Sequence, residues 1–276
     1  MMDDIRIISS DDPSISRILE DARAAEDAGR RDDAVRLYRD AADSGCSDAM
    51  VHLAMMLIDG TDDERKEAIS LLQRADAAGN SSGTRDLGYC YAVGIYVEKD
   101  KDTAARLYTK AAEAGNAKAM CNIGVMYSYG NGVEKDLTKA AEWYRRSAEA
   151  GYPRGMTDYA CALRDGTGVN KDPALAAEWF ARSGSPRAKR LLGFMKLRGD
   201  GIPKDFQGAL SLFEEASATD SKAMVALADL IVDADRGRAI SLYQTAAAKW
   251  NKDAAARLEK MGLPVPEAAP RRKKKD

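Results

Sequence analysis

The sequence has little of what most catalytic sites are made of. Its 276 residues contain a single histidine, His52, and four cysteines, none with a second cysteine at metal-ligand spacing. One histidine alone cannot complete an acid–base relay or a metal site, and no serine or cysteine nucleophile has a recognisable partner. We interpret His52 as a surface or packing residue. The sequence therefore predicts a protein that is not an enzyme, with no catalytic residue, no metal site and no cofactor.

Long apolar runs and a strong excess of one charge are also missing. No run of about 18 apolar residues is present, so we expect no membrane span. The first residues lack the basic start and apolar core of a secretory signal. The net charge is −2, with +3 in residues 263–276 and −5 in the rest, which does not favour a nucleic-acid binder. We expect a monomeric, cytoplasmic protein with free thiols and neither a membrane nor a nucleic-acid partner.

What the sequence does contain is an internal repeat. Residues 81–116 and 117–152 match over their whole length without a gap, and residues 153–185 and 186–220 follow with small deletions. A period of this size is typical of stacked supersecondary units rather than of one globular core. When residues 117–130 are numbered as positions 1 to 14, the apolar positions 4, 7 and 11 and the glycine at position 8 share one helix face. These residues are Met120, Ile123, Tyr127 and Gly124.

Each repeat encodes two helices joined by a short loop. Position 8 of the first helix holds only glycine or alanine. Because glycine costs about 1 kcal/mol in a helix relative to alanine, we expect a neighbouring helix backbone to approach closely there. The first helix ends at a glycine, which adopts the left-handed conformation cheaply, and the loop ends at an aspartate that caps the second helix. The most regular loops are Gly94–Asp100, Gly130–Asp136, Gly166–Asp172 and Gly199–Asp205.

These features resemble the Sel-one-like repeat family, a relative of the tetratricopeptide repeats. The matching features are the small residue at position 8, the glycine–x–glycine–valine loop before aspartate, and the run KAAEWY at residues 139–144. The resemblance covers roughly residues 30–251 and implies a right-handed superhelix of helix pairs that serves mostly as an interaction scaffold. We therefore predict an all-α fold, a right-handed α/α superhelical solenoid of about seven antiparallel helix pairs with a C-terminal capping helix.

The predicted domain organisation has three parts. Residues 1–12 form a flexible acidic N-terminus and residues 13–262 form the solenoid. Residues 263–276 form a disordered basic tail, because three prolines in seven residues prevent a helix. The basic run at 271–275 fits a nuclear address, a lipid or nucleic-acid contact, or a solubilising end, and composition favours the last. A nucleic-acid-associated protein working through this tail is a third functional class, recognisable by salt-dependent DNA binding that is lost without the tail.

The positions that escape the core face predict a binding groove. In solenoids of this type the first helices line the concave side, where positions 2, 5, 6 and 9 are open. Later repeats have cations at position 2, near the helix N-terminus, where each works against the helix dipole by about 0.3–1 kcal/mol. An acidic segment or a C-terminal carboxylate would explain them, and related repeats hold peptide carboxylates with lysine at position 2 and asparagine at position 6. The predicted groove residues are Lys118, Arg154, Arg187, Arg190, Lys222 and Asn122, with Tyr89, Tyr129 and Phe194 as aromatic anchors.

The cations also have a simpler explanation. Lysine at position 2 is common in the family where the surface needs only solubility. Asp158 could moreover neutralise Arg154, four residues before it on the same helix.

The leading functional hypothesis is a non-enzymatic scaffold or adaptor that binds a protein segment, acidic if the cations matter, in the groove. The alternative is a penicillin-recognising hydrolase like the cysteine-rich branch of the family, in which two cysteines pair within each unit. This sequence lacks that pairing, because its cysteines occupy different repeat positions. They are Cys46, Cys90, Cys121 and Cys161.

Overall fold

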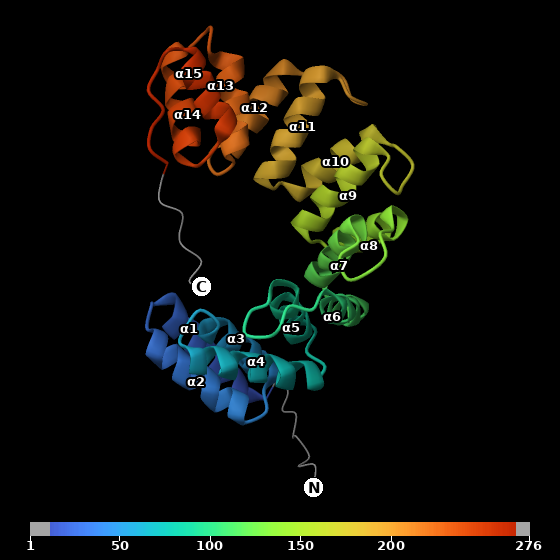
Figure 1. The fold of residues 1–276 in the computed structure, drawn as a ribbon, viewed down its shortest axis with the longest axis vertical. Coiled ribbons are helices and arrows are strands. Elements are labelled where there is room, and N and C mark those ends of the chain that lie inside the picture. Colours follow the sequence, from blue (N-terminus) through green and yellow to red (C-terminus); the bar gives the residue numbers. More distant parts are fainter. Residues whose placement is uncertain (1–11, 269–276) are drawn as a thin grey trace. The chain divides into compact units, whose positions relative to one another are not determined.

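The computed structural model describes residues 12–268, and these residues form helices and connecting loops (Figure 1). Fifteen α-helices and no strand occur in that range, so the predicted all-α fold is confirmed. The predictions for residues 1–11 and for the basic run at 271–275 lie outside the described residues. Within residues 12–268, no helix is both long enough and apolar enough to cross a membrane.

The helices fall into two compact units, residues 1–150 and residues 151–276. In each unit successive helices pack as pairs, and each pair packs against the next. Unit 1 contains α1 (Pro13–Asp27) with α2 (Arg31–Asp43), α3 (Ser47–Leu57) with α4 (Asp62–Ala77), α5 (Ser81–Val93) with α6 (Lys101–Glu113), and α7 (Ala117–Tyr129) with α8 (Leu137–Glu149). Unit 2 contains α9 (Pro153–Asp165) with α10 (Pro173–Ser183), α11 (Pro186–Arg198) with α12 (Phe206–Ser217), α13 (Ser221–Ile231) with α14 (Arg236–Ala248), and the final α15 (Lys252–Lys260). The single solenoid domain over residues 13–262 remains a prediction.

The helix ends follow the local chemistry that the sequence predicts. Gly94 and Gly130 directly follow α5 and α7 with φ of 85° and 68°, the left-handed region that ends a helix. Asp100 accepts hydrogen bonds from the first free amides of α6, and Asp136 accepts one from the amide of Lys139 in α8. The amide of Lys139 holds the pKa of Asp136 below its ordinary value. Each loop is therefore bounded by a glycine that stops one helix and an aspartate that starts the next.

The glycines at position 8 pack mainly against an aromatic ring, which corrects the prediction of a helix backbone there. A Cβ atom on Gly124 would lie 2.7 Å from Cε1 of Tyr144 in α8, the second helix of the same pair. The nearest backbone atom, the carbonyl oxygen of Ala140, would be 3.2 Å away. In unit 2 a Cβ atom on Gly193 would lie 2.8 Å from the ring of Phe213. The ring of the second helix thus fills the space that a side chain at position 8 would need.

In two of the regular loops, a second glycine lets the loop pack closely against the preceding helix pair. Gly132 has φ of 68°, and a Cβ atom there would collide with the carbonyl oxygen of Lys101 at the start of α6. Gly201 has the same relation to Pro173 at the start of α10. Tyr96 occupies this loop position in the first regular loop and adopts φ of 56°. This left-handed conformation is energetically unfavourable for a residue other than glycine.

Alanine and one aromatic residue make up much of each pair's core. Ala104 is fully buried one turn before the buried Tyr108 in α6, and α12 repeats this pattern with Ala209 and Phe213. In unit 2 the last pair is covered by α15, whose Ala254 and Leu258 are buried. The predicted capping helix is therefore confirmed.

Candidate functional site

The candidate site is the part of the first helices that the core leaves open. The core takes positions 4, 7, 8 and 11, so positions 2, 5, 6 and 9 remain, together with position 13, one turn beyond position 9. We call these open positions the first-helix face. It belongs to α3, α5 and α7 in unit 1, and to α9, α11 and α13 in unit 2.

In unit 1 this face exposes apolar and aromatic side chains. Tyr129 of α7 is 73% exposed, and Tyr89 of α5 and Met55 of α3 are each 52% exposed. Val93, one turn after Tyr89, is also exposed. Burying such surface contributes about 25 cal/mol per Å². These side chains are therefore the part of unit 1 that gains most from being covered by a partner.

A buried ion pair lies next to these aromatic residues. Arg85 Nη2 is 2.6 Å from Asp86 Oδ1, and both side chains are largely buried. Within residues 12–268, neither Asp86 Oδ2 nor Arg85 Nε has a hydrogen-bond partner. Burial raises the pKa of Asp86, and the positive charges of Arg85 and Lys118 offset only part of this effect. Lys118, at position 2 of α7, is thus close enough to act on an acid at position 6 of the preceding first helix.

In unit 2 two of the position-2 cations bind a carboxylate of the protein itself. Arg187 Nη1 of α11 is 2.7 Å from Oδ1 of Asp158, which occupies position 6 of the preceding first helix, α9. Arg154 Nε is 3.6 Å from Asp158 Oδ2. The contact with Arg154 is the neutralisation within one helix that the sequence suggested. The contact with Arg187 joins two repeats and repeats the relation between positions 2 and 6 that Lys118 and Asp86 have in unit 1.

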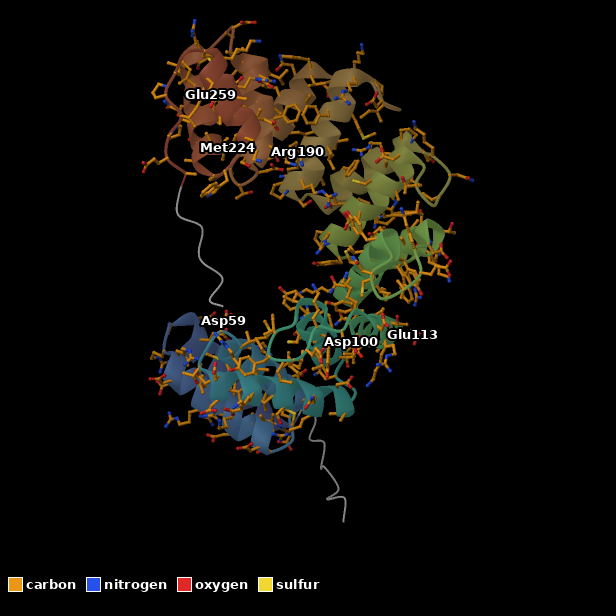
Figure 2. The ribbon with its side chains drawn as sticks, in the orientation of Figure 1. Asp59, Asp100, Glu113, Arg190, Met224 and Glu259 are labelled. Atoms are coloured by element: carbon orange, nitrogen blue, oxygen red, sulfur yellow. The ribbon has the colours of Figure 1, made fainter. Side chains whose placement is uncertain are left out.

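Arg190 of α11, labelled in Figure 2, forms an ion pair with Asp220, the residue that caps the start of α13. Its Nε lies 2.9 Å from Asp220 Oδ2, and both side chains are 14% exposed. Burial alone would raise the pKa of Asp220, but Arg190 and the first amides of α13 outweigh it, so this pKa lies below its ordinary value. Lys222 is exposed at position 2 of α13, and no carboxylate among residues 12–268 forms an ion pair with it.

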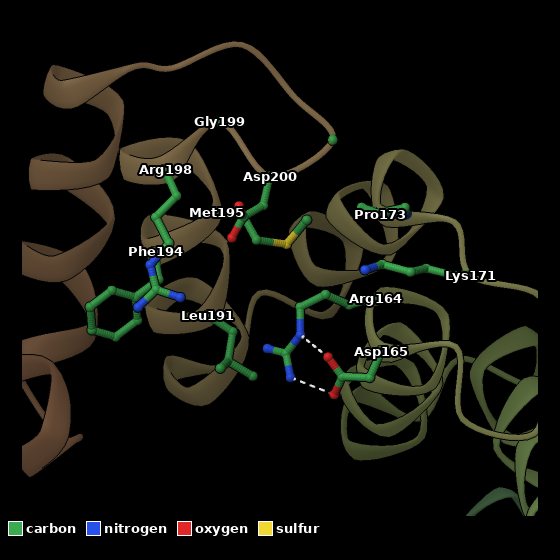
Figure 3. A pocket seen from close by; sticks show the side chains of 11 residues that line it. Arg164, Asp165, Lys171, Pro173, Leu191, Phe194, Met195, Arg198, Gly199 and Asp200 are labelled. Carbon is green, nitrogen blue, oxygen red and sulfur yellow. Dashed lines mark hydrogen bonds and ion pairs between the residues drawn. The ribbon is translucent and has the colours of Figure 1, made fainter.

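Phe194 at position 9 of α11 lines two hollows on the first-helix face of unit 2. The first hollow, of about 650 Å³, lies between α9 and α11 (Figure 3). The second, of about 380 Å³, lies along α11, α13 and α15. The ring of Phe194 packs edge-on against Phe213, with centroids 5.0 Å apart. The cations of the first hollow are Arg164, Lys171 and Arg198. Those of the second are Arg190, Lys222 and Arg257.

The predicted groove residues divide between the two units. Those in unit 1 are Lys118, Asn122, Tyr89 and Tyr129, and those in unit 2 are Arg154, Arg187, Arg190, Lys222 and Phe194. Within unit 2, Asp158 brings Arg154 and Arg187 together. The second hollow brings Arg190, Phe194 and Lys222 together.

Sequence reasoning missed the acids that join neighbouring repeats, and it missed Arg164 and Arg198 of the first hollow. A signal for two of these contacts was present, because Lys118 and Arg187 at position 2 follow an acid at position 6 of the preceding first helix, whereas Arg154 and Lys222 do not. Arg164 and Arg198 recur at no fixed repeat position, so the repeat pattern gave no signal for them.

The groups with the chemistry of nucleophiles are packed into the helices. Burial raises the pKa of the Cys90 thiol to about 11 and also raises that of Cys161, which makes the reactive thiolate scarce at neutral pH. The ring of His52 stacks on Tyr38 with centroids 5.1 Å apart, as expected for a packing residue. Within residues 12–268, no cluster of three or more His, Cys, Asp or Glu side chains is arranged to hold a metal ion. Cys46, Cys90 and Cys121 are buried, and Cys161 is partly buried.

The repeats match a known family over most of the chain. The Sel1 repeat model matches six successive segments, residues 47–80, 81–116, 117–152, 153–185, 186–218 and 221–249. The chain belongs to the Sel1 repeat family. Sel1 repeats form a helical solenoid that generally mediates protein–protein interaction without catalysis.

Solved structures of other Sel1 repeat proteins are similar to this one. A Sel1 repeat protein from Oxalobacter formigenes is 27% identical with a TM-score of 0.72, over 87% of this chain and 99% of that one. A protective antigen of uropathogenic Escherichia coli with an SLR fold is 30% identical with a TM-score of 0.68, over 83% of this chain. This chain spans about half of that protein, 52%. An immunity protein from Pseudomonas aeruginosa has a similar fold. It is 20% identical with a TM-score of 0.52, over 75% of this chain and 84% of that one. No curated protein sequence matches this Sel1 repeat chain significantly.

Proposed function

We propose that this protein is a non-catalytic scaffold that binds a segment of a partner protein on its first-helix faces. The observation that carries the proposal is the exposure of Tyr89 and Tyr129, 52% and 73%, on helices whose other large apolar side chains, apart from Val93, are buried or partly buried. Aromatic side chains supply much of the energy of protein interfaces. The general role of Sel1 repeats in protein–protein interaction supports the same function.

The aromatic residues, rather than most of the position-2 cations, are the proposed anchors. Arg187 already pairs with Asp158 at 2.7 Å, so a carboxylate of the partner would have to compete with an acid of the protein itself. Exposed pairs of this kind contribute about 0–1 kcal/mol even without a competitor. Tyr89 and Tyr129 bury apolar surface without such competition, so the bound segment is expected to present apolar side chains to unit 1.

Selection of peptides tests the binding function. Random peptides displayed on phage are selected on the full chain, and the enriched peptides are synthesised and titrated. Combining Tyr89→Ala with Tyr129→Ala is expected to weaken their binding at least tenfold, since one or two anchor residues at about 1.4 kcal/mol each reach that size. Phe206→Ala, at an exposed aromatic side chain of the second helix α12, is the matched control and should leave binding unchanged. Equal binding to all three proteins would contradict the proposal.

We also propose that the protein acts without catalysis, as a monomer in the cytoplasm. Free thiols are typical of a reducing compartment. A nitrocefin assay on the purified protein tests the penicillin-recognising alternative. Turnover above the rate of heat-inactivated protein would show an activity that this proposal does not allow.

A further inference from the structure

We propose that the hollow between α9 and α11 is an oxyanion subsite of unit 2, which takes an anionic group of the bound partner segment. Three cationic groups surround this space of about 650 Å³, those of Arg164, Lys171 and Arg198 (Figure 3). The inference rests on the proposed function in one respect, that a protein segment carries the anion.

The cations of this hollow exceed the acids that could neutralise them. Only two carboxylates line it, those of Asp165 and Asp200. Asp165 is engaged by Arg164 through two contacts of 2.7 Å, from Nε to Oδ1 and from Nη2 to Oδ2. Among residues 12–268, no carboxylate forms an ion pair with Lys171 or Arg198. One positive charge is therefore left over, and two cationic groups remain available to a ligand.

Packing of the repeat does not require the two arginines. Arg164 occupies position 12 of α9, where α5 and α7 have Ala92 and Ser128. Arg198 occupies position 13 of α11, where α7 has the exposed Tyr129. The same fold is thus built with small or apolar residues at both places. Lys171 differs from the two arginines, because a lysine recurs at this loop position in the regular repeats. The Cβ atom of Lys171 packs against Gly166, the glycine that ends α9.

The α11 side of the hollow is apolar apart from Arg198. Leu191, Phe194 and Met195 line it from α11, and the guanidinium carbon of Arg198 lies 5.6 Å from the centre of the Phe194 ring. A guanidinium over a ring is held in place while its N–H groups remain free to donate. The geometry therefore fits a carboxylate or phosphoryl oxyanion on an apolar stem, with the oxygens toward the cations and the stem on Leu191 and Phe194.

Small probes test the subsite without a known partner. The full chain, labelled with ¹⁵N, is titrated with phenyl phosphate, benzoate and the neutral benzyl alcohol, and chemical shifts of assigned amides are followed. We expect at least one of the two anions to shift the amides of residues 164–171 and 194–201 saturably, with benzyl alcohol at least tenfold weaker. Saturation by only one of the anions would identify the source of the oxyanion as phosphoryl or carboxylate.

Matched variants separate the subsite from general attraction of anions. Arg198→Gln is expected to weaken anion binding roughly tenfold, the loss of one charge-assisted hydrogen bond. Arg182→Gln is the control, because Arg182 lies 4.1 Å over the Trp179 ring in the same unit and lines neither hollow. The spectrum of each variant also reports whether it is folded. The inference is overturned if the neutral probe binds as well as the anions, if neither anion shifts these amides, or if both variants lose binding equally.

The failure of this inference and that of the proposed function give different results. Selected peptides that bind through Tyr89 and Tyr129, without anion binding at residues 164–201, would overturn the subsite alone. Saturable anion binding in a chain that selects no peptide would overturn the scaffold function and leave a site for a small anion.

Discussion

The first-helix faces of the two units are built on the same repeat but differ in chemistry. In unit 1 the open positions carry Met55, Tyr89 and Tyr129, all strongly exposed. In unit 2 the open positions carry more charge: Arg187 at position 2 pairs with Asp158 at position 6, and in α11 position 9 holds the partly buried Phe194 and position 13 the exposed Arg198. Positions 7 and 8 are apolar or small in both units, and so are positions 4 and 11 except in α11, where they hold Lys189 and Lys196. Packing therefore fixes the core positions, while the open positions are free to acquire different recognition chemistry.

Overall charge follows the same division. Residues 12–150 contain 25 Asp and Glu against 19 Lys and Arg, and residues 151–268 contain 15 against 17. The described part of unit 1 thus has a net charge of −6 and the described part of unit 2 one of +2. An acidic segment would be repelled by unit 1 and weakly attracted by unit 2. This difference favours an acidic partner group on unit 2 and an apolar one on unit 1.

The core should show no such difference between the units. Leucine at position 124 would overlap the Tyr144 ring in unit 1, and leucine at position 193 would overlap the Phe213 ring in unit 2. Each of Gly124→Leu and Gly193→Leu is expected to destabilise by about 1–3 kcal/mol or more. Urea denaturation measures this, with the exposed Ser70→Leu and Ala181→Leu as controls. If either variant unfolds at the same urea concentration as its control, position 8 is not a packing contact in that unit.

Two buried acids are expected to respond to pH in opposite ways. The pKa of Asp220 in unit 2 is lowered, so its ionic contribution to stability is present above the ordinary aspartate pKa of about 3.9 and is lost as pH falls through the lowered value. The pKa of Asp86 in unit 1 is raised by burial, so its contribution is present below the ordinary value and is lost as pH rises through the raised one.

Asparagine variants measure this contrast. At neutral pH, Asp220→Asn is expected to destabilise by about 1–2 kcal/mol, since it removes one partner of a largely buried pair with Arg190. This loss should shrink as pH falls below about 4. The effect of Asp86→Asn should change with the opposite sign, because the variant removes a charge whose burial is costly at neutral pH. The urea midpoints of both variants and the wild type, measured between pH 3 and pH 8, test this contrast. If the two variants change in stability with pH in the same direction, the predicted contrast is wrong.

The fold was predictable because its signals are local. A glycine that stops a helix and an aspartate that caps the next, such as Gly130 and Asp136, act within a few residues, so the sequence places both helix ends. The contact of Arg187 with Asp158 depends on how one repeat is placed against the next, which no local signal determines. For the same reason the division between residues 150 and 151 was not predicted, and Gly124 was assigned a backbone neighbour instead of the Tyr144 ring.

Charge reversal at position 2 should destabilise the protein where the cation is paired with an acid and not where it is unpaired. From sequence alone, glutamate there suits the helix N-terminus and costs no stability. In the structure, Arg187→Glu would place two carboxylates beside each other at Asp158, so we expect a loss of about 0.5–1 kcal/mol. Lys222→Glu, at the same position of α13, should leave the melting temperature unchanged or slightly raised. Equal melting temperatures for the two variants would show that the pair with Asp158 contributes nothing.

The smallest expected effect is the salt dependence of binding on each face. Peptides anchored on Tyr89 and Tyr129 bury apolar surface, whose free energy changes little between 0.05 M and 0.3 M sodium chloride. A peptide whose anion lies among Arg164, Lys171 and Arg198 should weaken about two- to fivefold over this range, because the Debye length falls below about 10 Å above 0.1 M salt. Titrations of both peptide classes at several salt concentrations measure the difference, and Arg198→Gln should reduce the slope for the anionic class only. A common slope for both classes would mean that the two faces do not differ in recognition chemistry, whatever their composition suggests.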